Sequence, residues 1–228
     1  MTRTSNARLA GFTYLFYIAV AFPSVVLMSR ATAGQGYAAK LASMVEHASE
    51  VRLSLVLGLI SCLCALVLAV TLYAITRDED RDLAMLGLTC RVAEGVTGAV
   101  WIPATLVLLW LATAKGANAP DGAAAQAIGA FVLEQDGVVV GATFFAAGST
   151  LFSWLLLRGR MIPVPLAWIG VVASVLLLVG LPLRLAGVLS GQVVQLLWLP
   201  MLLFEVPLGL WLLVKGVAPA RGDRALGR

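Results

Sequence analysis

Three charged residues lie inside long apolar stretches and are the first candidates for chemistry. Arg91 and Glu94 belong to the stretch 83–112, and Glu205 belongs to the stretch 193–214. A charge near the centre of a bilayer costs roughly 2.5 to 3.5 kcal/mol on insertion scales, so each of these residues needs a partner or a function. Arg91 and Glu94 are three residues apart, a spacing that places both on one face of a helix, where they can pair.

The three charges are also expected at a similar depth. At about 1.5 Å per residue, they lie about 12 to 16 Å from the helix ends assigned to the cytoplasm. We therefore hypothesise that Arg91 bridges Glu94 and Glu205 inside a helical bundle. With all three ionised the cluster has one excess negative charge, which suits it to hold a proton or a cation. The alternative is a structural cluster that fixes two helices, with one carboxyl neutral and hydrogen-bonded.

Three further polar side chains are expected at comparable depths, about 9 to 14 Å by the same arithmetic: Tyr14, Tyr17 and Ser149. Together with the charged cluster they could line a polar cavity that holds an ion or a ligand. The alternative assigns the tyrosines to an aromatic belt at the membrane surface and Ser149 to a close helix contact. The sequence alone leaves both interpretations open.

Small residues on the predicted fourth helix indicate helix packing. Gly137, Gly141 and Gly148 lie close to one stripe of that helix, and the first two have the spacing that lets two helices approach closely.

Motifs for metal binding and catalysis are missing from the sequence. The three cysteines, Cys62, Cys64 and Cys90, lie in apolar stretches without CxxC spacing, and their odd number does not favour a disulfide framework. His47 is the only histidine and lacks the companion ligands that a transition metal requires. No nucleophile-base motif, HExxH, P-loop or dinucleotide-binding glycine pattern is present in a meaningful position. We expect no metal, no cofactor and no enzymatic activity.

The composition predicts the elements that must position these residues. Of the 228 residues, 61% are hydrophobic and 12% are charged, whereas soluble domains have roughly half apolar and about a quarter charged residues. Because hydrocarbon cannot hydrogen-bond an exposed backbone, only helices or a closed barrel can span it. The apolar runs lack the alternation of barrel strands. The predicted fold is therefore all-α, a polytopic transmembrane helical bundle.

Six apolar stretches are long enough to cross a hydrocarbon core of about 30 Å, which takes roughly 20 helical residues. They are residues 9–28, 53–75, 83–112, 132–157, 166–189 and 193–214. The third is longer than needed and contains Pro103, so it should be tilted, kinked or extended beyond the bilayer. The segments between the stretches, including 30–52 and 113–131, are expected to be connections. Residues 1–216 would form one transmembrane domain, and 217–228 a disordered, basic cytoplasmic tail.

The distribution of Lys and Arg predicts the orientation. The predicted connections on the side of both termini carry about twice as many basic residues as the others, which places both termini in the cytoplasm and the protein in a bacterial inner membrane. This topology explains the net charge of +4 without a nucleic-acid partner. An alternative is a secretory signal with Ala31-Thr32-Ala33 as its small-residue cleavage site, but the first apolar run is longer than the usual h-region of roughly 7 to 15 residues.

Four segments carry a resemblance to a known family. They are RLAGFTYL at 8–15, LAMLG at 83–87 running into RVAE at 91–94, GSTLF at 148–152 with RMIP at 160–163, and EVPLGLWLLVKG at 205–216. In their order and spacing the chain resembles the bacterial membrane family catalogued as domain of unknown function 4386. The resemblance implies a multi-helix membrane domain. Because that family has no assigned activity, it supplies no catalytic residues.

Three classes of function remain. The first is a structural or regulatory multi-pass protein that acts through contacts with the lipid bilayer, with another copy of itself or with another membrane protein. The second is a small transporter or channel that uses the charged cluster, which would require an internal repeat or a water-filled cavity reaching Arg91. The third, a membrane-embedded enzyme, would have to rely on Glu94, Glu205 and Tyr14.

Overall fold

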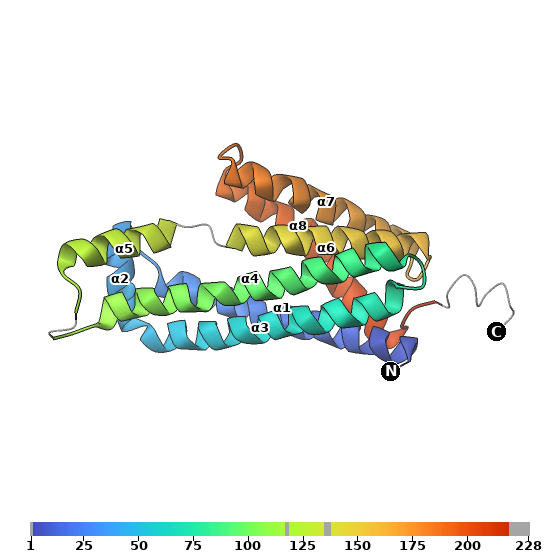
Figure 1. The fold of residues 1–228 in the computed structure, drawn as a ribbon, viewed down its shortest axis with the longest axis horizontal. Coiled ribbons are helices and arrows are strands. Elements are labelled where there is room, and N and C mark those ends of the chain that lie inside the picture. Colours follow the sequence, from blue (N-terminus) through green and yellow to red (C-terminus); the bar gives the residue numbers. More distant parts are fainter. Residues whose placement is uncertain (1, 117–118, 135–137, 219–228) are drawn as a thin grey trace, which may run out of the picture.

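The computed structural model describes residues 2–116, 119–134 and 138–218, and every regular element within these ranges is a helix. The helices are α1 Arg3–Ala31, α2 Gly36–Glu46, α3 Ala48–Thr76, α4 Arg81–Thr113, α5 Gly122–Glu134, α6 Val138–Arg158, α7 Val164–Leu185 and α8 Gly191–Val214 (Figure 1). Six segments are long and apolar enough to cross a membrane: α1, α3, α4, the α5–α6 segment, α7 and α8. The prediction of an all-α bundle with six spans is confirmed.

The spanning helices form a closed ring. Each packs most extensively against two others, in the order α1, α3, α4, α6, α7, α8 and back to α1, and α3 also touches α6. The start of α1, the α3–α4 turn, the α6–α7 turn and the end of α8 lie at one end of the molecule, called here the terminal end (Figure 1). Helices α2 and α5 and the α7–α8 turn lie toward the opposite end, the loop end. The expected cytoplasmic tail falls largely on residues 219–228, which lie outside the described residues.

Three helices are longer than a bilayer requires. Helices α1 and α3 have 29 residues each and α4 has 33, whereas α6, α7 and α8 have 21, 22 and 24. Since roughly 20 residues cross the hydrocarbon core, the three long helices extend beyond it. Excess length was predicted for 83–112 alone. Figure 1 shows that the extension reaches α2 and α5.

Helices α2 and α5 were not predicted, because the segments that contain them were interpreted as connections. Their apolar side chains pack on the extended parts of the long helices, where Met44 of α2 is buried in a small core with Ala31, Val51 and Leu108. The segment around α5 is rich in alanine, a strong helix former, so its helix was accessible to propensity arguments. This second core is separate from the main core within the ring.

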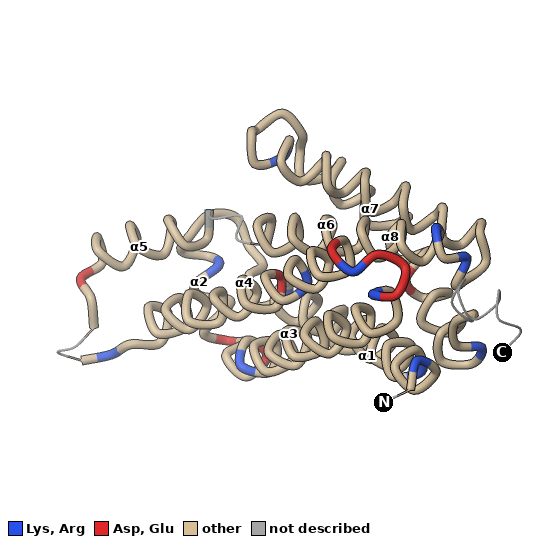
Figure 2. The backbone as a smooth tube through the Cα atoms, turned by 45° about the vertical axis from the view of Figure 1, so that its right-hand side comes forward, with Lys and Arg blue, Asp and Glu red and all other residues tan. Residues whose placement is uncertain are grey.

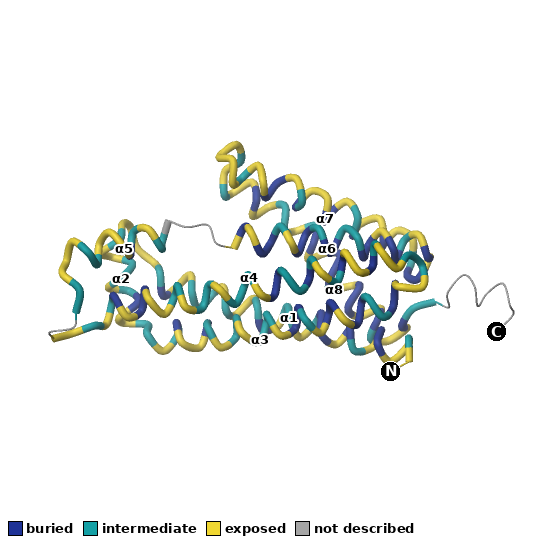
Figure 3. Tube along the Cα trace, viewed as in Figure 1, coloured by how far each residue is buried: buried dark blue, intermediate teal, exposed yellow. Residues whose placement is uncertain are grey.

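Charge and burial follow the expected membrane pattern. Figure 2 shows that most charged residues lie toward the two ends of the molecule, with a small group in its middle. Buried residues face the interior, most densely toward the terminal end, and exposed residues cover the outer faces of the helices (Figure 3). Large apolar side chains such as Phe22, Val100 and Leu203 are exposed there. Lipid, rather than water, is the suitable solvent for this surface.

Two glycine crossings hold the ring together. A Cβ atom on Gly11 would collide with the backbone nitrogen of Leu213 and lie 2.6 Å from the carbonyl oxygen of Gly209, so α1 and α8 touch backbone to backbone. A Cβ atom on Gly148 of α6 would lie 3.2 Å from the carbonyl oxygen of Gly87 on α4. Only Gly148 of these four glycines was predicted as a packing residue.

Replacing Gly11 by alanine should therefore weaken the α1–α8 crossing. The added methyl group meets backbone atoms that cannot rotate away, and overpacking of this kind costs about 1 to 3 kcal/mol. We expect a lower temperature of unfolding for Gly11→Ala in detergent, measured by size-exclusion chromatography after heating. Gly122→Ala is the matched control, because nothing lies within 4 Å of a Cβ atom at that position. Equal unfolding temperatures would contradict the crossing.

Candidate ligand site

Arg91 is fully buried at the centre of the ring, on α4. The glycine at 148 leaves room for its side chain, since a Cβ atom there would lie 3.0 Å from the Arg91 Cγ atom. The guanidinium carbon lies 4.9 Å from the centroid of the Phe145 ring, a cation–π contact with α6. Its NH1 atom lies 2.9 Å from the Oε2 atom of Glu94. The pair predicted from the three-residue spacing is present in the structure.

Glu94 joins two helices that are not neighbours in the ring. One of its carboxylate oxygens pairs with Arg91, and the other accepts a hydrogen bond of 3.2 Å from the hydroxyl of Tyr17 on α1. Helix α3 lies between α1 and α4 in the ring order, so this hydrogen bond crosses the interior. Only 8% of Glu94 is exposed.

Glu205 lies apart from this pair. It is 6% exposed, and its Oε1 atom is buried without a hydrogen-bond partner. No ion pair within 4 Å joins it to Arg91 among the described residues, so the expected bridge from Arg91 to both carboxylates is not formed. The Tyr14 side chain lies on the adjacent stretch of α1, where its Cβ atom is 3.2 Å from the position of a Cβ atom on Gly209.

The remaining candidate residues are Ser149 and the three glycines of the predicted fourth helix. Gly141 and Gly148 both face α4, and a Cβ atom on Gly141 would lie 3.0 Å from the Oγ1 atom of Thr97. Ser149 is buried, and its hydroxyl has no hydrogen-bond partner. Gly137 lies outside the described residues.

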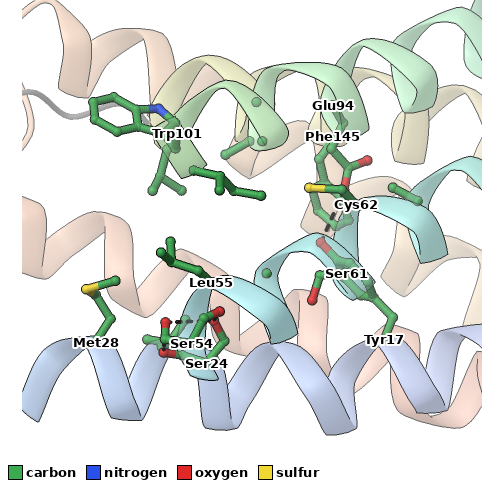
Figure 4. A pocket seen from close by; sticks show the side chains of 18 of the residues that line it. Tyr17, Ser24, Met28, Ser54, Leu55, Ser61, Cys62, Glu94, Trp101 and Phe145 are labelled. Atoms are coloured by element: carbon green, nitrogen blue, oxygen red, sulfur yellow. Dashed lines mark hydrogen bonds between the residues drawn. The ribbon is translucent and has the colours of Figure 1, made fainter. Parts of the chain in front are cut away.

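A cavity of about 740 Å³ runs through the interior of the ring toward the loop end. Five helices line it: α1, α3, α4, α6 and α8. Glu94 and Tyr17 lie together at its deep end, and Met28 and Trp101 lie at the other end of the view (Figure 4). Glu205 also lines the cavity, whereas Arg91 does not. The volume is in the range of about 300 to 1,000 Å³ that is usual for small-molecule sites.

The α3 wall of the cavity was missed in the sequence, although it leaves a signal there. Ser54, Gly58, Ser61 and Ala65 line the cavity and follow one another at intervals of three or four residues, which puts them on one helix face. Near the mouth, the Ser24 hydroxyl donates a hydrogen bond of 2.9 Å to the carbonyl oxygen of Ser54, and the Ser54 hydroxyl donates one of 3.0 Å to that of Ser24. A stripe of small residues among leucines and valines marks this face.

Several buried polar atoms at the deep end lack hydrogen-bond partners within the protein. They include the Nε and NH2 atoms of Arg91 and the Oε1 atom of Glu205. More than nine in ten buried polar groups in proteins are hydrogen-bonded, so a concentration of exceptions needs an explanation. Of the two residues only Glu205 lines the cavity, so a polar ligand or water that enters it can meet this carboxyl group but not Arg91.

A ring of apolar spanning helices around a cavity with a charged base defines an α-helical multi-pass membrane protein. The chain belongs to the family described as Domain of unknown function (DUF4386), whose family model matches residues 9–216. This match confirms the resemblance seen in the sequence. No curated protein and no solved structure was found to match the chain.

Removing the guanidinium should destabilise the fold. Arg91→Met leaves the Glu94 carboxylate buried without its ion-pair partner, and breaking a buried pair in this way costs about 3 to 5 kcal/mol. We expect a large loss of monodisperse protein on size-exclusion chromatography, and recovery when Glu94→Gln is added. Arg158→Met is the control, because this arginine pairs with Glu79 and Asp80 but is half-exposed. The account fails if the two arginine variants lose the same yield.

Proposed function

We propose that this chain is a small transporter that binds a solute in the cavity and carries it through the helix ring. The observation that carries the proposal is a cavity of drug-sized volume ending on two buried carboxylates, Glu94 and Glu205. Of the classes considered, a transporter is the one that was expected to need a cavity reaching Arg91; this cavity ends on Glu94, the ion-pair partner of Arg91, and Arg91 itself does not line it. The proposal assigns no enzymatic step, so the solute leaves chemically unchanged.

A purely structural role for the charges accounts for the geometry less well. An ion pair locks two helices only if its members come from different helices, and Arg91 and Glu94 both belong to α4. The interhelical contact in the group is the Tyr17–Glu94 hydrogen bond. Glu205 forms no ion pair among the described residues, and a buried charge without a role would be costly. Ligand binding gives this carboxylate a reason to be there.

The same proposal includes an orientation. The terminal end carries Arg77 in the α3–α4 turn, Arg81 at the start of α4 and Arg158 at the end of α6. Cytoplasmic loops are enriched in basic residues, which supports a bacterial inner membrane with this end in the cytoplasm. The cavity, and with it α2 and α5, would then face the outside. Partners beyond the lipid bilayer, such as a second copy of the chain or another membrane protein, are compatible with this arrangement.

Cys62 offers a test of transport that does not require the solute to be known, because its side chain lines the cavity. A transporter must expose its site to both sides of the membrane in turn. In a Cys64→Ser, Cys90→Ser variant, we expect a small, membrane-impermeant thiosulfonate reagent to modify Cys62 from either face of sealed vesicles of known orientation, and faster from the loop end. The modification is followed by mass spectrometry.

The control retains Cys64 instead, in a Cys62→Ser, Cys90→Ser variant. Cys64 is buried and does not line the cavity, so its modification should be slow from both faces. Modification of Cys62 from the loop end alone would indicate a one-sided binding protein and contradict transport. No modification from either face would contradict an accessible cavity as well.

A further inference from the structure

The base of the cavity is acidic in character. Glu94 and Glu205 both line it, while Arg91 lies behind them, against the Phe145 ring and Gly148. No Lys, Arg or His is found among the described residues that line the cavity. A solute that reaches the base therefore meets carboxylate oxygens rather than positive charge.

The charge balance at the base selects a monovalent cation. One guanidinium and two carboxylates leave one excess negative charge when all are ionised. The titratable and charged groups around Glu205 are Arg91 and Glu94 from α4, Tyr14 and Tyr17 from α1, and Cys62 from α3. Of these groups only Arg91 carries a positive charge. An anion would be repelled here, and a single positive charge restores neutrality.

The carboxyl oxygen of Glu205 accepts hydrogen bonds, and this narrows the class of cation that can bind it. The Oε1 atom of Glu205 is buried without a partner and needs a donor with a proton to give. A protonated amine has such N–H groups, whereas a quaternary ammonium ion has none. A transition metal ion is disfavoured, because no group of three or more His, Cys, Asp or Glu side chains that could hold one occurs in the described part of the chain.

The walls of the cavity indicate what the amine is attached to. At about 740 Å³ the space is far larger than an ammonium ion requires. Its walls are mainly apolar and include Met28, Leu55, Trp101 and Trp198. Aromatic and alkyl groups of a solute would be buried against these side chains.

We infer that the solute is an amphipathic primary or secondary amine whose ammonium group binds Glu205 in exchange for a proton. This inference rests on the proposed function and names the substrate class of the same site. With no solute bound, a proton on Glu205 balances the excess charge. When the protonated amine binds, Glu205 releases its proton to water in the cavity. A contact between the ammonium group and the carboxylate then replaces the O–H bond. No other bond is made or broken, and the charge of the site is the same before and after.

The fluorescent primary amine dansylcadaverine is a suitable probe, because it combines an ammonium group with an aromatic body. We expect it to bind the purified full chain in detergent, and its affinity to rise with pH as protons compete less well for Glu205. Glu205→Gln should weaken binding by roughly 10- to 100-fold, as expected for loss of one charge-assisted hydrogen bond of about 1.5 to 3 kcal/mol, and should remove the pH dependence.

Three comparisons make the result specific. The analogue in which a hydroxyl replaces the amine, and the one with a trimethylated nitrogen, should both bind at least about 10-fold more weakly. Glu46→Gln, which removes an exposed carboxylate on α2, should leave binding unchanged. Gly58→Leu should block binding without touching the carboxylates, because only the Ser24 hydroxyl lies within 4 Å of a Cβ atom at this position.

Equal binding of the amine and the hydroxyl analogue, or equal binding by wild type and Glu205→Gln, would overturn the inference. So would absence of binding by well-folded wild-type protein. These outcomes are separable from failure of the proposed function. If the amine binds but Cys62 is modified from one face only, transport is refuted and the ligand class stands. If Cys62 is modified from both faces but the amine is not preferred, the ligand class is refuted and transport stands.

Discussion

A carboxyl group that has no cationic partner is buried in an interior of low dielectric, and its burial constrains the other parts of the molecule. A charged side chain inside a bilayer requires compensation. Arg91 provides it for Glu94, within the same helix and at 2.9 Å. Glu205 has no such partner among the described residues, and its Oε1 atom is buried without a hydrogen bond. Glu205 lines the cavity, so its carboxyl group can meet something that is not part of the protein.

The architecture around the charges follows from where helices can approach closely. Backbone contact at Gly11 and Gly209 closes the ring between α1 and α8 near the terminal end. The gap left by the missing side chain of Gly148 admits the Arg91 stem, so α4 and α6 remain close despite the buried guanidinium. Toward the loop end, small residues on α3 and the interior faces of four other helices leave the space that forms the cavity. The ring is therefore tight where it holds the charges and wide where a solute can enter.

The parts of this structure that sequence reasoning reached are those set by local rules. The six spans follow from apolar length, and the Arg91–Glu94 pair follows from a three-residue spacing. The Tyr17–Glu94 hydrogen bond could not be predicted, because it depends on the order of helices around the ring. The bridge from Arg91 to Glu205 was expected from equal depth alone, which does not specify how side chains are directed across an interior. The helices α2 and α5 were missed because their segments were interpreted as connections between spans, although the alanine-rich α5 was accessible to propensity arguments.

The central claim is that a proton and a cationic amine occupy the same carboxylate, and infrared difference spectroscopy tests it most directly. A protonated carboxyl group has its own C=O stretching band, separate from those of the carboxylate. In the wild-type protein, addition of dansylcadaverine should remove one such band, and that band should be absent from Glu205→Gln before any amine is added. A carboxyl band that persists unchanged when the amine is bound, or that survives in Glu205→Gln, would contradict the account.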